Sequence, residues 1–304
     1  MTAPLHLAIG AFDGIHLGHR AVLHSARQAA RTHGGLVGVL TYEPHPSKVL
    51  RPQAAVPMIF GQAQKTDRLT EAGAQWIHYE PFTPDHAAMP AAAFPAWLKQ
   101  KFPALQTIHV GDNFRYGHQR AGDGQSLLQN SQALGLTVRL VDAVQLGQET
   151  VSSSRIRQAL SQGELALANQ MLLRPYEAEG VIGPGRQLGR TIGFPTINLT
   201  WQPELQPALG VYAVEVIHQG TALPAVANFG QRPTVENGPV APLLEAHILR
   251  GTAPTTGDRI RVRWLNYLRS EQKFPNLAAL QAQIAIDTVQ AKECLGLTGD
   301  VVTR

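Results

Sequence analysis

The sequence has little of several features that would point to particular classes of protein. Its single cysteine, Cys294, excludes an internal disulfide and a cysteine-rich metal site. No apolar run approaches the ~20 residues that a membrane helix requires, and no basic region followed by an apolar stretch marks a signal peptide. Lys and Arg form no dense stripe typical of nucleic-acid binding. We therefore expect a cytoplasmic protein without a membrane, nucleic-acid or obligate protein partner.

The composition that remains is that of a folded chain. Hydrophobic residues make up 44% and charged residues 16% of the 304 residues, a balance typical of globular proteins. This length exceeds what one compact core usually holds, so two domains are expected. The net charge of +4 and the 12 histidines suit small anionic substrates.

The first half of the chain alternates between strand-like and helix-like segments. Predicted strands cover residues 5–9, 36–41, 76–79, 107–110 and 136–141, and predicted helices cover 18–32, 62–72, 91–101 and 124–133. Such alternation predicts an α/β domain of the Rossmann-like kind, with a mostly parallel sheet. Two short helices, at 153–160 and 164–173, close this half, so we place the first domain at 1–174.

The second half, 175–304, is rich in short strands broken by Gly and Pro. Predicted strands cover residues 177–182, 211–217, 222–228, 243–249 and 259–266. Their spacing favours a small antiparallel barrel or sandwich. One amphipathic helix is expected at 276–295, with five apolar residues on or near one face: Leu277, Leu280, Ile284, Ile286 and Val289.

The most informative motif follows the first predicted strand. That strand ends at Gly10, and a turn with Asp13 and a second glycine leads to His16 and His19 at the start of a helix. The free N–H groups and the dipole of a helix N-terminus favour an anion, so the motif predicts a phosphate site. The alternative is an incidental spacing of two surface histidines.

Three further polar clusters follow strands of the predicted sheet. His45 lies between two prolines, Asn113 follows a Gly-Asp pair, and residues 152–157 read Ser-Ser-Ser-Arg-Ile-Arg. Ligands of open α/β sheets bind outside the carboxyl ends of the strands, so we expect these clusters at one site. The structural alternatives are a rigid turn at His45, a turn residue at Asn113 and a helix N-cap at the serines.

The second half carries a glycine-rich motif at residues 183–198. Glycines let backbone N–H groups approach phosphates closely. The motif is no Walker A loop, because no Gly-Lys-Ser/Thr follows. From the residues alone, a phosphate site and a plain β-turn are equally compatible with it.

The N-terminal motifs resemble the nucleotidyltransferase half of bacterial bifunctional riboflavin kinase/FAD synthetases. The resemblance implies transfer of AMP from ATP to FMN, with release of pyrophosphate. It implies that His16 and His19 are catalytic and stabilise the charge that develops on the phosphates. It also implies flavin contacts at Asn113 and His45, and ATP or phosphate contacts at Gly10, Phe12, Asp13, Gly18, Ser153, Ser154, Arg155 and Arg157.

The C-terminal motif is similar to the signature of the riboflavin kinase domain, a six-stranded barrel. The resemblance implies that Thr196 and Asn198 hold Mg²⁺ with ATP, and that Glu245 is the catalytic base. It places phosphate contacts at Gly189, Arg190 and Gly193, and a flavin contact at Arg232. Mg²⁺, ATP, riboflavin and FMN are thus the expected cofactor and substrates.

The chain departs from the family pattern at several positions. Ala11 stands where the family usually has Asn, Ser154 where it has Thr, and Leu173 where it has Gly. The loop after Leu249 carries Arg250 and lacks the usual acidic and aromatic groups. One alternative is therefore an FAD synthetase whose barrel only binds flavin. The others are an adenylyltransferase for a different phosphate ester, and a flavin-responsive regulator or nucleic-acid-binding protein.

Overall fold

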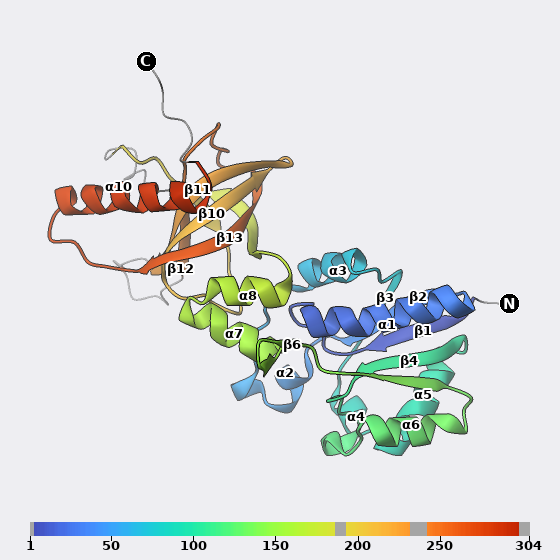
Figure 1. The fold of residues 1–304 in the computed structure, drawn as a ribbon. Coiled ribbons are helices and arrows are strands. Elements are labelled where there is room, and N and C mark those ends of the chain that lie inside the picture. The colour runs from blue at the N-terminus through green and yellow to red at the C-terminus, as the bar shows by residue number, and fades with distance from the viewer. Residues whose placement is uncertain (1–2, 186–192, 232–241, 298–304) are drawn as a thin grey trace. The chain divides into compact units, whose positions relative to one another are not determined.

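The computed structural model describes residues 3–185, 193–231 and 242–297 (Figure 1). The chain divides into two compact units, Met1–Ser154 and Arg155–Arg304. Three predicted site residues lie outside the described residues. They are Gly189 and Arg190, expected to contact phosphate, and Arg232, expected to contact the flavin.

The first unit is built on a parallel sheet with the strand order β3-β2-β1-β4-β5. The strands are β1 (Leu5–Ile9), β2 (Leu36–Tyr42), β3 (Trp76–Glu80), β4 (Leu105–Gly111) and β5 (Thr137–Val141). All four pairings are parallel, so every carboxyl end lies at the same edge of the sheet. The predicted Rossmann-like α/β unit is confirmed, and its central strand β1 leads directly into the His16–His19 motif.

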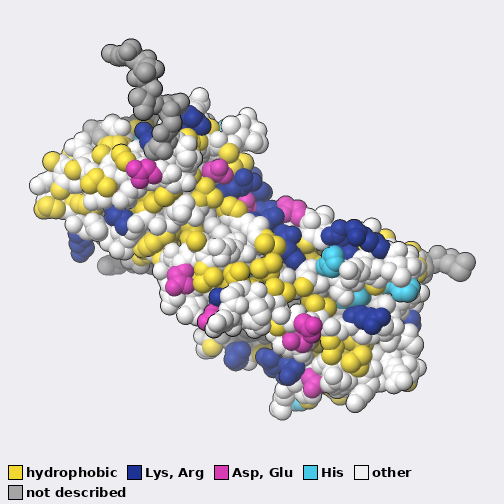
Figure 2. Space-filling view, in the orientation of Figure 1, with side chains coloured by type: hydrophobic (Ala, Val, Ile, Leu, Met, Phe, Trp, Pro, Cys, Tyr) yellow, Lys and Arg dark blue, Asp and Glu magenta, His cyan; other side chains and the backbone are white. Residues whose placement is uncertain are grey.

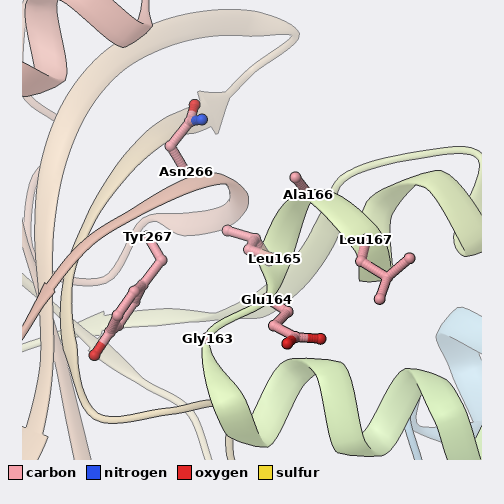
Figure 3. A pocket seen from close by; sticks show the side chains of 7 residues that line it. All are labelled: Gly163, Glu164, Leu165, Ala166, Leu167, Asn266 and Tyr267. Carbon is pink, nitrogen blue, oxygen red and sulfur yellow. The ribbon is translucent and has the colours of Figure 1, made fainter.

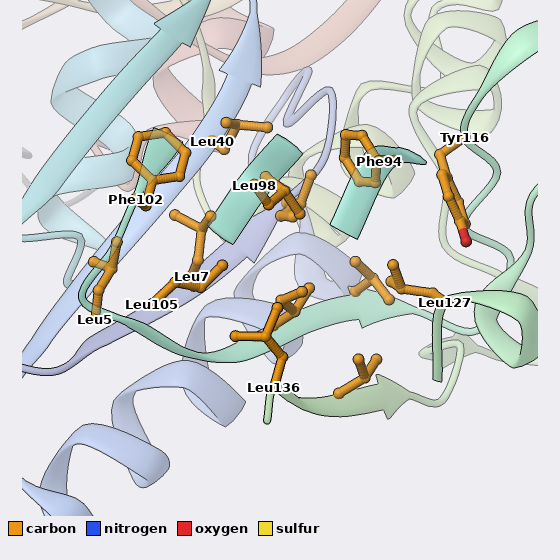
Figure 4. Close-up of a cluster of buried hydrophobic side chains, with 14 residues drawn as sticks. Leu5, Leu7, Leu40, Phe94, Leu98, Phe102, Leu105, Tyr116, Leu127 and Leu136 are labelled. Atoms are coloured by element: carbon orange, nitrogen blue, oxygen red, sulfur yellow. The ribbon is translucent and has the colours of Figure 1, made fainter. Parts of the chain in front are cut away.

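Helices cover both faces of this sheet (Figure 1). Helix α1 (Leu17–His33) packs against β1, β2 and β4. On the opposite face, α5 (Phe94–Lys101) and α6 (Gly124–Gln132) enclose a core that includes Leu7, Phe94 and Leu98 (Figure 4). The remaining elements are α2 (Pro46–Leu50), α3 (Gln62–Glu71), α4 (Pro84–Ala87), the 3₁₀ turns Pro52–Ala54, Ala91–Ala93 and His118–Arg120, and a hairpin of β6 (Gln145–Leu146) and β7 (Glu149–Thr150).

A buried chain of polar side chains lies under α1. The Thr107 hydroxyl is 2.8 Å from His6 Nδ1 and 2.7 Å from His109 Nε2. The other ring nitrogen of His109 is 2.8 Å from the Ser25 hydroxyl on α1. Burial, with the nearby His6 and Arg139, lowers the pKa of His109 to about 4. The neutral His109 therefore ties α1 to the middle of the sheet.

The second unit contains a closed antiparallel barrel with the strand order β10-β11-β12-β9-β8-β13. Its strands are β8 (Tyr176–Gly183), β9 (Ile197–Thr200), β10 (Gly210–His218), β11 (Thr221–Gln231), β12 (Pro242–Ile248) and β13 (Arg259–Ser270). Aromatic rings fill the interior, where Trp264 lies 4.5 Å from Tyr212 and 5.5 Å from Phe229 between centroids. The predicted barrel is confirmed. Strand β9 was missed because it is only four residues long and begins inside the glycine- and proline-rich motif.

Two helices precede the barrel in the chain, α7 (Ser153–Gln162) and α8 (Leu165–Leu172). A third, α10 (Leu277–Cys294), follows the last strand and packs on the barrel. The expected C-terminal helix is confirmed, but three of the five apolar residues named for it lie at the surface. Leu277, Ile286 and Val289 are 53%, 50% and 54% exposed, whereas Asp287 is 2% exposed. The reason is an ion pair, because both oxygens of Asp287 accept hydrogen bonds from Arg269 on β13, at 2.8 and 2.7 Å.

No helix among the described residues combines the length and the apolar character that crossing a membrane requires. On the face shown in Figure 2, basic and acidic side chains are interspersed over the surface.

Candidate functional site

Helix α1 begins at a histidine cap. His16 precedes the helix, and its Nδ1 accepts hydrogen bonds from the backbone N–H groups of Gly18, at 3.1 Å, and His19, at 3.4 Å. Because Nδ1 accepts, the neutral ring carries its proton on Nε2. The rings of His16 and His19 stack with centroids 3.7 Å apart. Burial, then the neighbouring His16 and Lys65, holds the pKa of His19 well below its usual value. The site thus has two adjacent neutral imidazoles at a helix N-terminus.

The segment between β1 and α1 has glycines at two close approaches. A Cβ on Gly10 would lie 3.3 Å from the Phe12 ring, and one on Gly18 would lie 3.2 Å from His16 Cε1. The Phe12 ring is buried and lies 5.2 Å from the His19 ring between centroids. These residues, which the sequence assigns to ATP, form the immediate packing around the two histidines.

Asp13 joins this segment to two distant parts of the chain. Its carboxylate Oδ1 accepts a hydrogen bond from the N–H of Ile59, at 2.9 Å. Its backbone carbonyl accepts one from the hydroxyl of Ser153, at 2.8 Å. The structure therefore brings Ser153, the first residue of α7, to the His16–His19 segment across 140 positions of sequence.

The other residues of the predicted triphosphate site follow Ser153 along α7. Ser154 is exposed, and Arg155 and Arg157 are partly exposed in the first two turns of the helix. A helix N-terminus with serine hydroxyls and guanidinium groups has the chemistry of an anion site. An N-cap role of these serines is compatible with the same geometry, so the phosphate contacts stay a prediction.

Two predicted flavin residues occupy the carboxyl ends of other strands. His45, after β2, caps α2, and its Nδ1 accepts from the N–H of Ser47 at 3.2 Å. Asn113, after β4, is exposed in a turn closed by a bond from the N–H of Phe114 to the carbonyl of Gly111. His45 is thus engaged in a cap, whereas the Asn113 side chain lies at the surface.

A lysine that sequence reasoning missed lies behind the histidines. Lys65, on α3, is 8% exposed, and its ammonium donates a hydrogen bond to the Thr41 hydroxyl at 2.7 Å. Burial lowers its pKa to about 8, against the opposing effect of Asp13 and Glu43. No motif marks this residue, and its neighbours on α3 are mostly polar, so the sequence alone offers no signal for it.

In the barrel, three polar residues align across neighbouring strands. Glu245 on β12 lies opposite Asn198 on β9 and, on its other side, opposite Asn228 on β11. Directly opposite residues of antiparallel strands share a face, with Cβ atoms about 5 Å apart. Leu244 and Ala246, which flank Glu245, are buried, so Glu245 belongs to the outer face of the barrel. Asn228 is a residue to which sequence reasoning gave no role.

Asn198 presents an unsatisfied oxygen. It is 7% exposed, and among the described residues its Oδ1 has no hydrogen-bond partner. Gly185 leaves the space for its amide, because a Cβ there would lie 2.1 Å from Asn198 Nδ2. Thr196, two positions earlier, is exposed, and so is Gly193, which has a φ of 85°. A hydroxyl and a free amide oxygen are ligands that suit a hard cation such as Mg²⁺.

The hollow drawn in Figure 3 lies away from these residues. It has a volume of about 410 Å³ and lies between the start of α8 and β13. Its lining consists of Gly163, Glu164, Leu165, Ala166, Leu167, Asn266 and Tyr267. No predicted site residue belongs to this lining, so the hollow does not define the candidate site.

Comparison with known proteins assigns the two halves. A family model described as FAD synthetase matches residues 2–155, and one described as riboflavin kinase matches residues 172–295. The bifunctional riboflavin kinase/FMN adenylyltransferase of Escherichia coli (strain K12) is 37% identical over 293 residues, covering 96% of this chain and 93% of that protein. This chain belongs to the bifunctional riboflavin kinase/FMN adenylyltransferase family.

Other relatives agree. The proteins of the same name from Listeria monocytogenes and Bacillus subtilis are 34% and 32% identical, over 92% and 94% of this chain and 89% and 90% of theirs. A crystal structure titled a macrolide-efflux protein, from Streptococcus pneumoniae, matches with a TM-score of 0.87 and 27% identity, over 96% of this chain and 94% of that one. The predicted enzyme family is confirmed, and the match of both halves favours it over an FAD synthetase with a barrel that only binds flavin.

Proposed function

We propose that this chain makes FAD from riboflavin in two ATP-dependent steps, phosphorylation on the barrel and adenylyl transfer on the α/β unit. One observation carries the proposal. Each half holds a distinct constellation suited to phosphate chemistry, the stacked His16 and His19 in one and the aligned Asn198 and Glu245 in the other. Each constellation lies within the residues matched by the corresponding family model.

In the adenylyl-transfer step, a phosphate oxygen of FMN attacks the α-phosphorus of ATP, and the bond to pyrophosphate breaks. The Nε2–H of His16, and His19 beside it, donate hydrogen bonds to the oxygens on which charge develops. Ser153, Ser154, Arg155 and Arg157 hold the leaving phosphates. The segment between β1 and α1 is shaped by Gly10, Phe12, Asp13 and Gly18. The flavin is bound by Asn113 and His45. Positioning and charge stabilisation carry this chemistry without a covalent nucleophile.

In the kinase step, Glu245 accepts the proton of the primary hydroxyl of riboflavin as that oxygen attacks the γ-phosphorus of ATP, and the bond from that phosphorus to ADP breaks. Thr196 and Asn198 hold Mg²⁺, which neutralises phosphate charge when bound. The free Oδ1 of Asn198 supports this assignment, because a buried acceptor without a partner is costly unless a ligand completes it. Gly189, Arg190 and Gly193 contact the ATP phosphates, and Arg232 contacts the flavin.

Product analysis with matched variants tests both assignments. Purified protein is incubated with MgATP and either riboflavin or FMN, and the flavins are separated by chromatography. His19→Ala abolishes FAD formation from FMN and leaves FMN formation intact, whereas Glu245→Ala does the reverse. His33→Ala, at the far end of α1, and Glu293→Ala, on α10, are the matched controls. Loss of both activities in both variants contradicts the two-site assignment. If the wild-type chain forms neither FMN nor FAD, the proposed function is refuted.

We further propose that the two catalytic domains are residues 1–174 and 175–304, and that the enzyme works in the cytoplasm. The family models end at 155 and begin at 172, so they leave most of α7 and α8 unassigned. The bond from Ser153 to Asp13 supports placing α7 with the adenylyl-transfer domain. Activity of a fragment covering 1–174 with FMN, and of one covering 175–304 with riboflavin, tests this boundary.

A further inference from the structure

We propose that Lys65 is a positioning residue of the adenylyl-transfer site, which fixes the segment between β1 and α1 and supplies the charge behind His19. The proposal rests on the function proposed above. It concerns a residue outside the predicted motifs.

Lys65 reaches the segment through two successive hydrogen bonds. Its ammonium donates to the Thr41 hydroxyl at 2.7 Å, and that hydroxyl donates to the backbone carbonyl of Ala11 at 3.1 Å. Thr41 is fully buried at 0% exposure. The chain Lys65–Thr41–Ala11 therefore fixes a backbone position between Gly10 and Phe12, where the sequence departs from the family pattern by having Ala11.

A second connection holds α3 against the same segment. The Asp13 carboxylate accepts from the N–H of Ile59, three residues before α3 begins at Gln62. Lys65 lies in the first turn of that helix, with its N–H bonded to the carbonyl of Gly61. Two independent hydrogen-bonded links thus set the distance between the lysine and the two histidines.

The charge of Lys65 acts on the groups around it. The facing titratable groups are Asp13, His16, His19, Glu43 and Tyr79, whose ring centroid lies 5.6 Å from the ammonium. A positive charge here opposes protonation of His19 and contributes to its lowered pKa. The lysine therefore favours the neutral imidazole, which donates a hydrogen bond without carrying a charge.

Burial of this ammonium is costly for folding. Among the described residues, Thr41 is the acceptor for one of its three N–H groups, and it is a neutral one. The attraction of Asp13 and Glu43 offsets part of the cost of burying this charge, but burial has the larger effect, because the pKa of Lys65 is lowered to about 8. An apolar side chain of similar length avoids the cost that remains, so a lysine at this position points to a role in the adenylyl-transfer site.

The deciding measurement is the pH dependence of kcat/KM for FAD formation from FMN. A lysine required in its charged form, with a pKa of about 8, makes kcat/KM fall as the pH rises through that value. Lys65→Arg keeps the charge and moves this basic limb to higher pH. Lys65→Met removes the charge and lowers kcat/KM at neutral pH by roughly 100-fold, a loss typical of misplaced catalytic groups. An unchanged basic limb in Lys65→Arg, or wild-type kcat/KM in Lys65→Met, overturns the proposal.

Two further measurements separate this role from a structural one. The histidine titration followed by NMR shows the pKa of His19 rising in Lys65→Met, and an unchanged pKa contradicts the charge effect. Thr41→Val lowers FAD formation while Thr41→Ser retains it, and equal effects of the two contradict the hydrogen-bonded link. A retained NMR spectrum of the first unit shows that each variant is folded, and FMN formation by the barrel, measured on the same samples, is the internal activity control. Absence of FAD from the wild-type chain would instead refute the proposed function.

Discussion

His16 caps the helix that carries His19, and the two rings stack with centroids 3.7 Å apart. One side chain therefore serves the fold through Nδ1, while its Nε2 is the atom that the proposed mechanism assigns to the substrate. Structural and catalytic effects of substituting His16 are separable for this reason, because another capping residue satisfies the first role and leaves the second unfilled.

Substitutions at His16 are predicted to separate the cap from the chemistry. His16→Ala removes the acceptor for two backbone N–H groups and lowers the free energy of unfolding of the first unit by about 1 kcal/mol. His16→Asn restores a good cap and returns the stability to near wild type, yet FAD formation stays lost. Pulse proteolysis in urea measures the stability, and the FMN assay measures the activity. Wild-type FAD formation by His16→Asn would assign the role of His16 to capping alone.

The buried His109 is predicted to make the first unit sensitive to acid. Its pKa is about 4 in the folded chain, against 6.5 when exposed, so the unfolded state binds the proton more readily. Stability is therefore retained above pH 6.5 and lost as the pH falls toward 4. Between pH 7 and pH 5 this group costs about 2 kcal/mol.

The variant His109→Gln tests this source of acid sensitivity. It removes the titrating group and keeps a side chain able to bond Thr107 and Ser25. Pulse proteolysis in urea at pH 7 and pH 5 compares it with the wild-type chain. We expect a smaller difference between the two pH values in the variant, whatever its absolute stability. An equal difference would place the acid sensitivity elsewhere.

Space for the Asn198 amide is predicted to be essential for the kinase step. In Gly185→Ala the new Cβ meets Asn198 Nδ2, so the amide must move away from its position opposite Glu245. We expect FMN formation to fall at least about 10-fold, as for other groups that orient a metal ligand. FAD formation from FMN is the internal control and stays unchanged. FMN formation at the wild-type rate would remove Asn198 from the site.

The ion pair between Arg269 and Asp287 is predicted to hold α10 on the barrel. Asp287→Ala leaves the Arg269 guanidinium, 16% exposed, without its carboxylate, at a cost of about 3–5 kcal/mol. Hydrogen exchange of α10 followed by mass spectrometry measures the loss of protection. The double variant Arg269→Met/Asp287→Leu leaves no unpaired charge and recovers much of the protection. Full protection of α10 in Asp287→Ala would show that its other contacts suffice.

Local and periodic signals account for what the sequence predicted well. The parallel sheet follows from alternating strand and helix patterns, and the placement of His16 and His19 at a helix N-terminus follows from a glycine turn. Both signals lie within short stretches of chain. Lys65 carries no such signal, because the proposed role depends on its hydrogen bond to Thr41, 24 positions away. Thr41 in turn contacts the segment that follows β1. Contacts of this kind exist only in the folded chain.

The same reason explains the errors in the second half. Apolar spacing predicted an amphipathic α10 with Leu277, Ile286 and Val289 on or near one face, yet these side chains are exposed. The helix contacts the barrel through Asp287, which pairs with Arg269 on β13, and through the buried Ala291. Strand β9 is too short for a periodic pattern, and it is stabilised by β8 and β12 on its two sides. In both cases a neighbouring strand decides how the element packs. The sequence of the element itself carries no information about that neighbour.

The closed barrel has a consequence for the robustness of the kinase site. In an open sheet an edge strand can slip by two residues and keep its inward and outward faces. A ring of six paired strands has no such edge, since a slip of β9 against β12 would have to be matched by its pairing with β8 and so on around the ring. The alignment of Asn198, Glu245 and Asn228 is therefore a property of the whole circumference. Mutations far from the site that leave the ring closed should leave that alignment intact.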